Sequence, residues 1–372
     1  MKRYTVDKII DRKKIYYLIR CGEVMTIEPL PTKYLSHRVR SNVSPNTIRR
    51  EAYSISYYLN YLEEMELELV ATFELPFDEQ HSLFTGFLQW LKSAGHNGKE
   101  KKQIPSNSTC NTYLRDVFGF YNFLAMQYEQ FGSLKVLSEQ TITVSNSIGV
   151  KRSITRQHFR GYLKEEEHRG KSIEQDKILI LLEACANTRD QLLLLLLAET
   201  GYRIGELLGV NYTKDIDYKK RLIKVQFREA NENGARAKYA EYRSALVSRD
   251  TFEILLYYLS EYRELLKKTD YLFVNLSGDT AGKSFNVNAV YAMLRRLEKK
   301  TGIKATPHNL RHYFANQRRK SGWDLPLISK ALGHKHIETT IKYLDIDTEE
   351  LVDASEDYYK KNQSIFMVDK LL

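Results

Sequence analysis

Six consecutive leucines, Leu192–Leu197, constrain the fold of this 372-residue chain more than any other segment. Thr188 and Gln191 precede them with the spacing of a helix-capping box, which predicts a helix. A helix this apolar is typical of a buried position, because on a surface it would expose leucines to water. The run is also far shorter than the roughly 20 apolar residues of a membrane-spanning helix. The segment therefore predicts the central helix of a globular domain.

The residues around this helix predict a mixed α+β domain with a small antiparallel sheet, over residues 172–372. A strand is expected at 222–227 and a returning strand at 244–248, with the turn signal Asn233-Gly234 between them. Gly333 is a suitable residue to end a helix, because glycine tolerates the left-handed conformation found there. Further helical segments are expected at 173–186, 286–300, 307–321, 326–332 and 338–344.

The first part of the chain predicts a short basic extension, residues 1–40, and then an all-helical domain, residues 41–165. One strand is expected in the extension, at 16–19, and Pro29 and Pro31 are expected to interrupt regular structure after it. The fold class is therefore mainly α, with two domains and a small extension. A chain of this length suits that division, at about 150 residues per domain.

Three helices are expected in the all-helical domain. The first starts at Ser44 and Pro45, a typical N-cap and first helical residue, and the others cover 80–93 and 109–129. Residues 142–156 keep no helical period and predict the start of an extended linker that ends near residue 172.

The chain is basic, with 57 Lys and Arg against 47 Asp and Glu, a formal net charge of +10. The excess is shared evenly, 24 − 19 = +5 up to residue 170 and 33 − 28 = +5 after it. A basic chain favours a polyanionic partner, nucleic acid before an anionic membrane. Its three cysteines are far apart, which excludes a disulfide framework or a CxxC-type zinc site and fits a reducing compartment. With no apolar leader or membrane segment in the sequence, we expect a cytoplasmic protein with no membrane partner.

The first candidate functional motif is TGYRIGEL, residues 200–207. Arg203 follows Gly201 at a loop-to-helix junction, where a planar guanidinium suits an anion. Glu206 lies three residues on and can orient that guanidinium. Taken alone, however, the pair is more typical of a solvated helix surface.

The second motif is TPHNLRH, residues 306–312. His308 and Arg311 lie on one face of the expected helix and can bind one phosphate, although such a pair alone is more typical of a solvated helix start. A zinc site is the alternative, because His308 and His312 are four residues apart and His334 and His336 could add ligands. Asn309 stands where a zinc protease motif has glutamate, which argues against it.

The third motif is LGHKHIETTIKY, residues 332–343. His334 directly follows Gly333, so the backbone at the helix end sets its position. Tyr343 follows nine residues later, but with 26 tyrosines in the chain any single one is more typical of packing.

In this order and spacing, the motifs TGxRxGEL, HxLRH, LGH and the following tyrosine resemble the catalytic domain of the tyrosine recombinase (phage integrase) family. The resemblance covers roughly residues 172–350 and extends loosely to a helical core-binding domain over about 42–165. It implies an active site made of Arg203, Lys238, His308, Arg311, His334 and Tyr343, with Glu206 supporting Arg203.

The hairpin lysine is the least determined of these residues. Lys238 lies just before the returning strand and matches best, but the hairpin connection is longer than is usual in the family. Lys224 and Arg236 therefore remain weaker alternatives. Asn309 and Tyr313 depart from the residues common in the HxLRH helix, at positions not expected to touch the phosphate.

The resemblance implies a site-specific DNA recombinase that cleaves and rejoins strands through a 3′-phosphotyrosyl intermediate, with no cofactor and no metal. Tyr343 would attack the phosphorus, His308 would accept its proton, Lys238 would protonate the leaving 5′ oxygen, and His334 would hydrogen-bond the phosphate. The alternatives are a type IB topoisomerase, which relaxes supercoils with the same chemistry, and a catalytically silent DNA-binding regulator.

The implied partners are double-stranded recombination sites, other copies of the chain in a tetramer on DNA, and an accessory excision factor. The apolar tail at 364–372 is expected to pack either on a neighbouring subunit or on its own domain. The 40-residue extension suits an integrase or transposase of a mobile element better than a chromosome-resolving enzyme.

Overall fold

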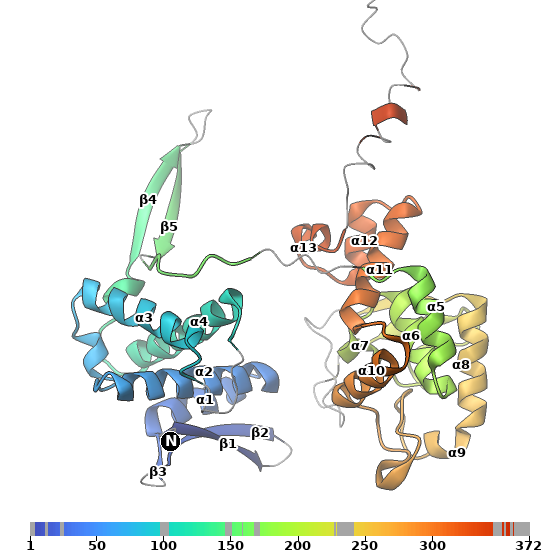
Figure 1. Cartoon of the computed structure of the whole chain (residues 1–372), viewed down its shortest axis with the longest axis horizontal. Coiled ribbons are helices and arrows are strands. Elements are labelled where there is room, and N and C mark those ends of the chain that lie inside the picture. The colour runs from blue at the N-terminus through green and yellow to red at the C-terminus, as the bar shows by residue number, and fades with distance from the viewer. Residues whose placement is uncertain are drawn as a thin grey trace, which may run out of the picture. The chain divides into compact units, whose positions relative to one another are not determined.

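The computed structural model describes residues 4–11, 14–22, 26–96, 104–145, 151–157, 159–166, 172–226, 228, 242–344, 352, 355–357 and 360. The chain divides into two compact units, Met1–Glu167 and His168–Leu372 (Figure 1). Helices dominate both units and small antiparallel sheets complete them, which confirms the expected fold class.

The first unit opens with a three-stranded antiparallel sheet in the order β1-β2-β3. Its strands are β1 (Tyr4–Asp11), β2 (Lys14–Cys21) and β3 (Thr26–Ile27), and β1 and β2 pair from Tyr4↔Cys21 to Asp11↔Lys14. The sheet packs on α1 (Pro29–Arg40) and α2 (Pro45–Glu64). Sheet and helices share one core, which includes Tyr17, Ile19, Leu35, Ile55, Phe120 and Leu124.

Three helices carry the rest of this unit: α2, α3 (Phe77–Lys92) and α4 (Asn107–Gln127). Ser44 caps α2 and Ser106 caps α4, each side-chain oxygen accepting a backbone N–H three residues later. Between the helices lies a second, aromatic core that includes Tyr58, Phe84, Phe87, Phe118 and Tyr121. A short 3-10 turn, η1 (Ala71–Phe73), connects α2 to α3, and a second one, η2 (Lys135–Leu137), follows α4.

Two expectations for this unit were wrong. Pro29 and Pro31 do not interrupt the chain but begin α1, where the missing N–H costs nothing because the first turn has no acceptor for it. Residues 142–156 do not start a linker, since β4 (Glu139–Ser145) and β5 (Lys151–Gln157) form an antiparallel pair that extends away from the helices of its unit (Figure 1). Residues 141–144 are all β-branched, with apolar Ile142 and Val144 alternating with threonine, and this strand signal was missed.

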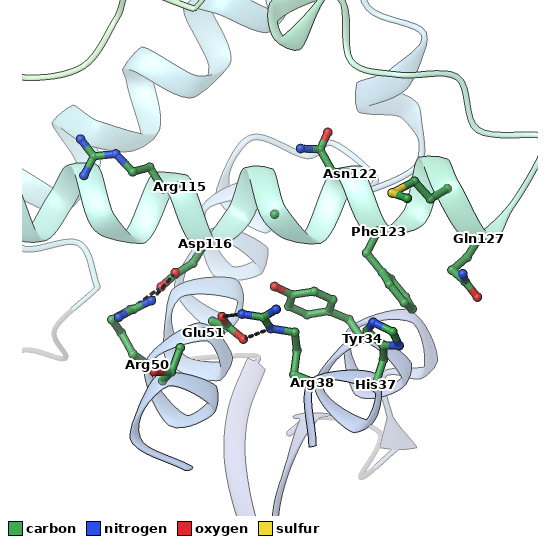
Figure 2. A pocket seen from close by; sticks show the side chains of 13 residues that line it. Tyr34, His37, Arg38, Arg50, Glu51, Arg115, Asp116, Asn122, Phe123 and Gln127 are labelled. Atoms are coloured by element: carbon green, nitrogen blue, oxygen red, sulfur yellow. Dashed lines mark hydrogen bonds and ion pairs between the residues drawn. The ribbon is translucent and has the colours of Figure 1, made fainter. Parts of the chain in front are cut away.

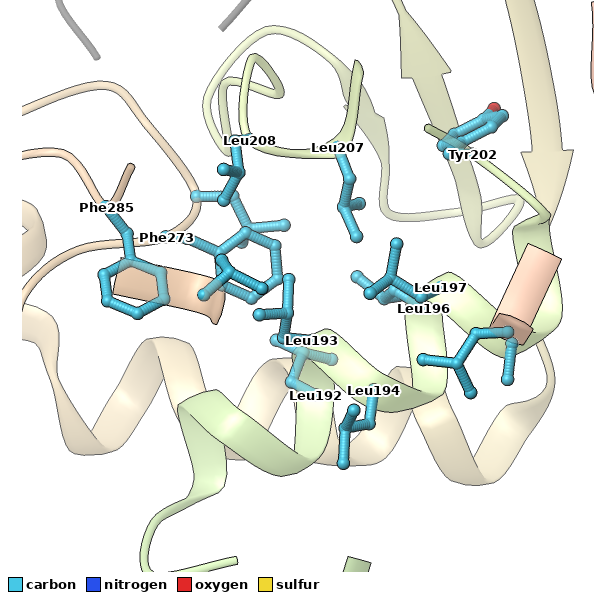
Figure 3. Packing of buried hydrophobic residues seen from close by; sticks show 14 of the residues in the cluster. Leu192, Leu193, Leu194, Leu196, Leu197, Tyr202, Leu207, Leu208, Phe273 and Phe285 are labelled. Carbon is cyan, nitrogen blue, oxygen red and sulfur yellow. The ribbon is translucent and has the colours of Figure 1, made fainter. Parts of the chain in front are cut away.

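In the second unit the leucine run lies inside α6 (Thr188–Thr200), as predicted. Leu192, Leu193, Leu194, Leu196 and Leu197 are completely buried (Figure 3). The helix cap differs from the expected one: Asn187 is the N-cap, and its side chain accepts the N–H of Asp190. The surrounding helices are α5 (Gln175–Ala184), α8 (Arg249–Glu261), α10 (Val287–Thr301) and α11 (Pro307–Lys320).

Helix α8 was not predicted, although Phe252, Leu255 and Tyr258 give it a buried stripe at three-residue spacing. The sheet of this unit has the order β6-β7-β8, with strands β6 (Ile216–Asp217), β7 (Leu222–Val225) and β8 (Arg243–Leu246). The predicted strand pair is thus present, while its turn at Asn233-Gly234 lies outside the described residues.

The remaining elements of this unit are short: α7 (Ile204–Leu207), α9 (Arg263–Leu266), η4 (Gly278–Thr280), α12 (Leu325–Leu332) and α13 (Ile337–Ile341). Over the residues that the structure describes, no helix is both long and apolar enough to cross a bilayer.

Candidate active site

Helix α11 forms the centre of the candidate site. Thr306 caps it by accepting the N–H of Asn309 at 3.1 Å, and Pro307 occupies its first position. Arg311, in the second turn of the helix, meets the loop after α6 and the C-terminal end of α12. Two segments that are distant in sequence therefore reach the same guanidinium.

Arg311 joins these segments through its guanidinium, although only 2% of the residue is exposed. Nη1 donates to the carbonyl of Gly201 at 2.5 Å, and Nη2 donates to the carbonyl of Leu332 at 2.7 Å. Among the described residues, Nε–H has no hydrogen-bond partner. Burial, aided by the charge of Arg203, lowers the pKa of Arg311 to about 10, so the group remains a cation at neutral pH.

Arg203 lies at the start of α7, and the turn that leads into this helix requires a glycine at position 201. Gly201 adopts a left-handed conformation at φ +62°, and a Cβ there would lie 2.5 Å from the Phe314 ring. Beyond this turn, Arg203 Nη1 donates to Glu206 Oε1 at 3.0 Å, and its backbone N–H donates to Oε2 at 2.7 Å. Glu206 therefore holds both the backbone and the half-buried guanidinium of Arg203.

His334 follows Gly333, which ends α12 in the left-handed conformation at φ +64°. Its Nε2 lies 2.8 Å from Arg311 Nη2, and its Nδ1 lies 2.9 Å from Thr340 Oγ1. Burial, with the nearby cations Arg311 and Arg203, lowers the pKa of His334 to about 3. The ring is therefore neutral, and because Arg311 can only donate, Nε2 accepts and Nδ1–H donates to Thr340.

Tyr343 is half-buried among the side chains of this site. Its ring stacks on His312 at 4.2 Å between centroids and lies 5.1 Å from the ring of His308 and 5.0 Å from that of His334. The Arg311 guanidinium lies 5.5 Å from the same ring. The structure thus brings together Arg203, Glu206, His308, Arg311, His334 and Tyr343.

His308 differs from His334 because it is exposed to solvent. Its Nε2 lies 3.1 Å from Nε2 of His312, and partial burial together with Arg311 lowers its pKa. A neutral imidazole next to a phenol can accept a proton. In the described part of the chain, no three His, Cys, Asp or Glu side chains are grouped so that they could hold a metal ion.

Lys238 lies outside the described residues, as does Arg236. Lys224 is on β7, where its backbone pairs with Ser244 of β8. Lys238 therefore remains a prediction.

Three supporting residues were not predicted: Arg243, Asn316 and Thr340. Arg243 on β8 donates through Nη2 to Glu206, Asn316 donates to the carbonyl of Tyr343 at 3.1 Å, and Thr340 accepts from His334. His312 was considered only as a metal ligand, whereas its ring stacks on Tyr343. The spacing of Asn316, four residues after His312 on one helix face, is the only signal in the sequence.

Residues 171–350 match the model of the phage integrase family. Over 369 residues the chain is 28% identical to transposase A from transposon Tn554 of Staphylococcus aureus (strain N315), covering 96% of this chain and 99% of the transposase. It is 25% identical to the tyrosine recombinase XerD of Oceanobacillus iheyensis (strain DSM 14371 / CIP 107618 / JCM 11309 / KCTC 3954 / HTE831), covering 87% and 95% of the two chains.

The fold is also similar to that of the Tn1549 transposon integrase in complex with transposon right end DNA. That similarity has a TM-score of 0.60 at 17% identity, over 89% of this chain and 98% of the integrase chain. The shared fold and the match over 171–350 agree with the motifs that meet around Arg311. Residues 171–350 of the chain belong to the phage integrase family of tyrosine recombinases.

Proposed function

We propose that this protein is a site-specific recombinase of a mobile genetic element, which cleaves and rejoins DNA through a 3′-phosphotyrosyl intermediate at Tyr343. The observation that carries the proposal is the position of the Tyr343 ring, within 5.5 Å of the Arg311 guanidinium and close to two neutral imidazoles. Similarity to the Tn554 transposase over nearly the whole chain supports the assignment to a mobile element.

Arg203 and Arg311 bind the scissile phosphate in this proposal. The phosphodiester gathers negative charge on its non-bridging oxygens in the transition state, and planar guanidiniums stabilise that charge with fixed geometry. Arg311 is held by two backbone carbonyls and by His334, so its orientation is set before DNA arrives. Its Nε–H is buried and has no partner among the described residues, and we assign this donor to the phosphate.

Tyr343 Oη attacks the phosphorus while the bond to the 5′ oxygen breaks. The phenol proton passes to His308, whose lowered pKa keeps it neutral, and Lys238 donates a proton to the leaving oxygen. Religation reverses these steps when a 5′-hydroxyl of the partner strand attacks the phosphotyrosine. We assign His334 the positioning of Arg311, since its Nε2 accepts from that guanidinium; donation to the phosphate requires the other tautomer.

Three helices of the first unit offer a face for DNA. A groove of about 500 Å³ between α1, α2 and α4 is lined by three arginines, two carboxylates and two amides: Arg38, Arg50, Arg115, Glu51, Asp116, Asn122 and Gln127 (Figure 2). Arg38 and Arg50 are oriented by two-pronged hydrogen bonds to Glu51 and Asp116. Guanidinium and amide groups recognise phosphates and base edges, so this unit would act as the core-type DNA-binding domain and the second as the catalytic domain.

Assembly of a tetramer on two DNA sites, and an accessory excision factor, complete the proposal. The test is a two-site plasmid assay with the DNA that flanks the coding sequence, run beside relaxation of a supercoiled plasmid without such sites. Strand exchange between the sites is expected. Relaxation alone, without exchange, would instead identify a topoisomerase.

Cleavage is expected to proceed at the same rate with and without excess EDTA. In this mechanism Arg203, Arg311 and Lys238 supply the positive charge that stabilises the phosphate, and the phosphotyrosyl bond preserves the energy for religation. The measurement is adduct formation on a nicked substrate after dialysis against the chelator. Loss of the adduct that Zn²⁺ or Mg²⁺ restores would contradict this mechanism.

Lys238→Ala is expected to slow cleavage by about 10²–10⁴, the usual contribution of a general acid. The defect should nearly vanish on a substrate with sulfur in place of the bridging 5′ oxygen, because a thiolate leaves without protonation. Lys224→Ala and Arg236→Ala are the controls and should cleave both substrates at the parent rate. If sulfur instead restores cleavage to Lys224→Ala, then Lys224 is the acid.

A further inference from the structure

The Glu206 carboxylate lies between two guanidiniums, and only one of them belongs to the predicted active site. Arg203 donates to both carboxylate oxygens, and Arg243 Nη2 donates to Oε2. The Glu206 side chain is 1% exposed and that of Arg243 is 10% exposed. The Glu206–Arg243 pair therefore interacts largely out of contact with bulk water, where electrostatic effects are strong, while the Arg203 side chain remains 24% exposed.

Arg243 is held by its backbone pairing, by the Tyr202 ring and by the Glu206 carboxylate. Its backbone pairs with Val225 in the β7–β8 ladder. Its guanidinium lies 5.0 Å from the centroid of the Tyr202 ring, and the Tyr202 hydroxyl in turn donates to the carbonyl of Ile223 at 2.7 Å. A planar, stacked cation in this position cannot be reproduced by a lysine.

The positive charge of Arg243 affects how strongly the group of Arg203 and Glu206 attracts the phosphate. Glu206 and Arg203 alone would form a neutral pair, with the carboxylate cancelling the charge that Arg203 offers to DNA. A second guanidinium on the same carboxylate leaves the group with a net charge of +1. The field of Arg243 also reaches further into the site, since it contributes to the lowered pKa values of Arg311 and His334.

We propose that Arg243 is a positioning residue for cleavage: it shares the Glu206 carboxylate, fixes that carboxylate against Arg203, and so preserves the charge and orientation of Arg203 toward the scissile phosphate. This inference rests on the proposed function. It concerns a residue on β8 that does not itself have to touch the DNA.

The test is a double-mutant cycle on single-turnover cleavage of a nicked substrate, which traps the covalent complex. Arg243→Gln and Arg243→Lys are each combined with Arg203→Lys. Alone, each Arg243 variant should cleave about 10- to 100-fold more slowly, as is usual when a supporting partner is removed. In the Arg203→Lys background the same change should slow cleavage by a further factor of less than about three, because the effects of substitutions in residues that act as one unit are not additive.

DNA affinity and thermal unfolding separate this role from a loss of folding. Both Arg243 variants should bind the site with a Kd within about threefold of the parent, because phosphate contacts elsewhere dominate affinity. The matched control is Arg228→Gln, which removes a guanidinium from the buried carboxylate of Asp215 in the same unit. Assayed below its unfolding temperature, it should cleave at the parent rate.

Three results would overturn the inference: parent-rate cleavage by both Arg243 variants, an equal loss in the Arg203→Lys background, or recovery on the substrate with a bridging 5′ sulfur. The last would mean that Arg243 acts through the general acid. A parent protein that forms no adduct at all would instead refute the proposed function, so the two failures are distinguishable.

Discussion

Tyr343→Phe is expected to bind its DNA site with unchanged affinity and to form no covalent adduct. The substitution removes one oxygen, the nucleophile, and leaves the ring that stacks on His312 at 4.2 Å. The backbone carbonyl of residue 343 keeps its hydrogen bond from Asn316. The measurement is a denaturing gel of the labelled nicked substrate, in which the parent gives a slow-migrating band and the variant gives none.

Tyr358→Phe is the matched control for this result, because Tyr358 is a further tyrosine close in sequence. It should form the adduct at the parent rate. An adduct with Tyr343→Phe, lost instead in Tyr358→Phe or Tyr359→Phe, would move the nucleophile to that residue. The positions of His308 and His334 around the Tyr343 ring would then have no catalytic meaning.

Arg311→Lys is expected to lower the cleavage rate by at least about 10²–10³, the loss typical of one donor to a developing charge. An ammonium has a single nitrogen and cannot reach the carbonyls of Gly201 and Leu332 together, as the two Nη atoms do. A buried carbonyl left without its donor costs about 1–3 kcal/mol, so the variant should also unfold at a lower temperature. Cleavage is therefore measured well below that temperature, with bound DNA confirmed by gel shift.

Arg318→Lys is the control for this second prediction, since Arg318 lies on the same helix. Its guanidinium stacks between Phe314 and Trp323, about 5 Å from each ring, and so the substitution costs comparable packing. We expect it to cleave at the parent rate once folded. Near-normal cleavage by Arg311→Lys would exclude the guanidinium from the transition state.

The central features of the fold were predictable because they depend on local pattern. A run of leucines can only be buried, and the structure places α6 at the centre of its unit. The errors occurred where one local signal has two meanings. Pro29 and Pro31 break a helix from inside but favour its first turn, and residues 142–156 lack a helical period because they form strands.

The candidate active-site residues could be selected as a set because their spacing along the chain resembles a known family. The contacts that bring them together were not predictable, because these contacts depend on how the fold packs. Arg311 meets Gly201 and Leu332 only after α6, α11 and α12 have packed. Arg243 on β8 reaches Glu206 on α7, and no periodicity links two residues 37 positions apart.

The most direct test of the proposed mechanism is identification of the residue that becomes linked to DNA. Trypsin is unsuitable, because cleavage after Lys342 and Lys360 leaves Tyr343, Tyr358 and Tyr359 on one peptide. A glutamate-specific protease cuts after Glu338, Glu349 and Glu356, and so separates Tyr343 from the other two. Mass spectrometry of the trapped, nuclease-trimmed complex should find the nucleotide on the peptide of residues 339–349. A nucleotide on the peptide that begins after Glu356, or on neither peptide, would contradict the mechanism.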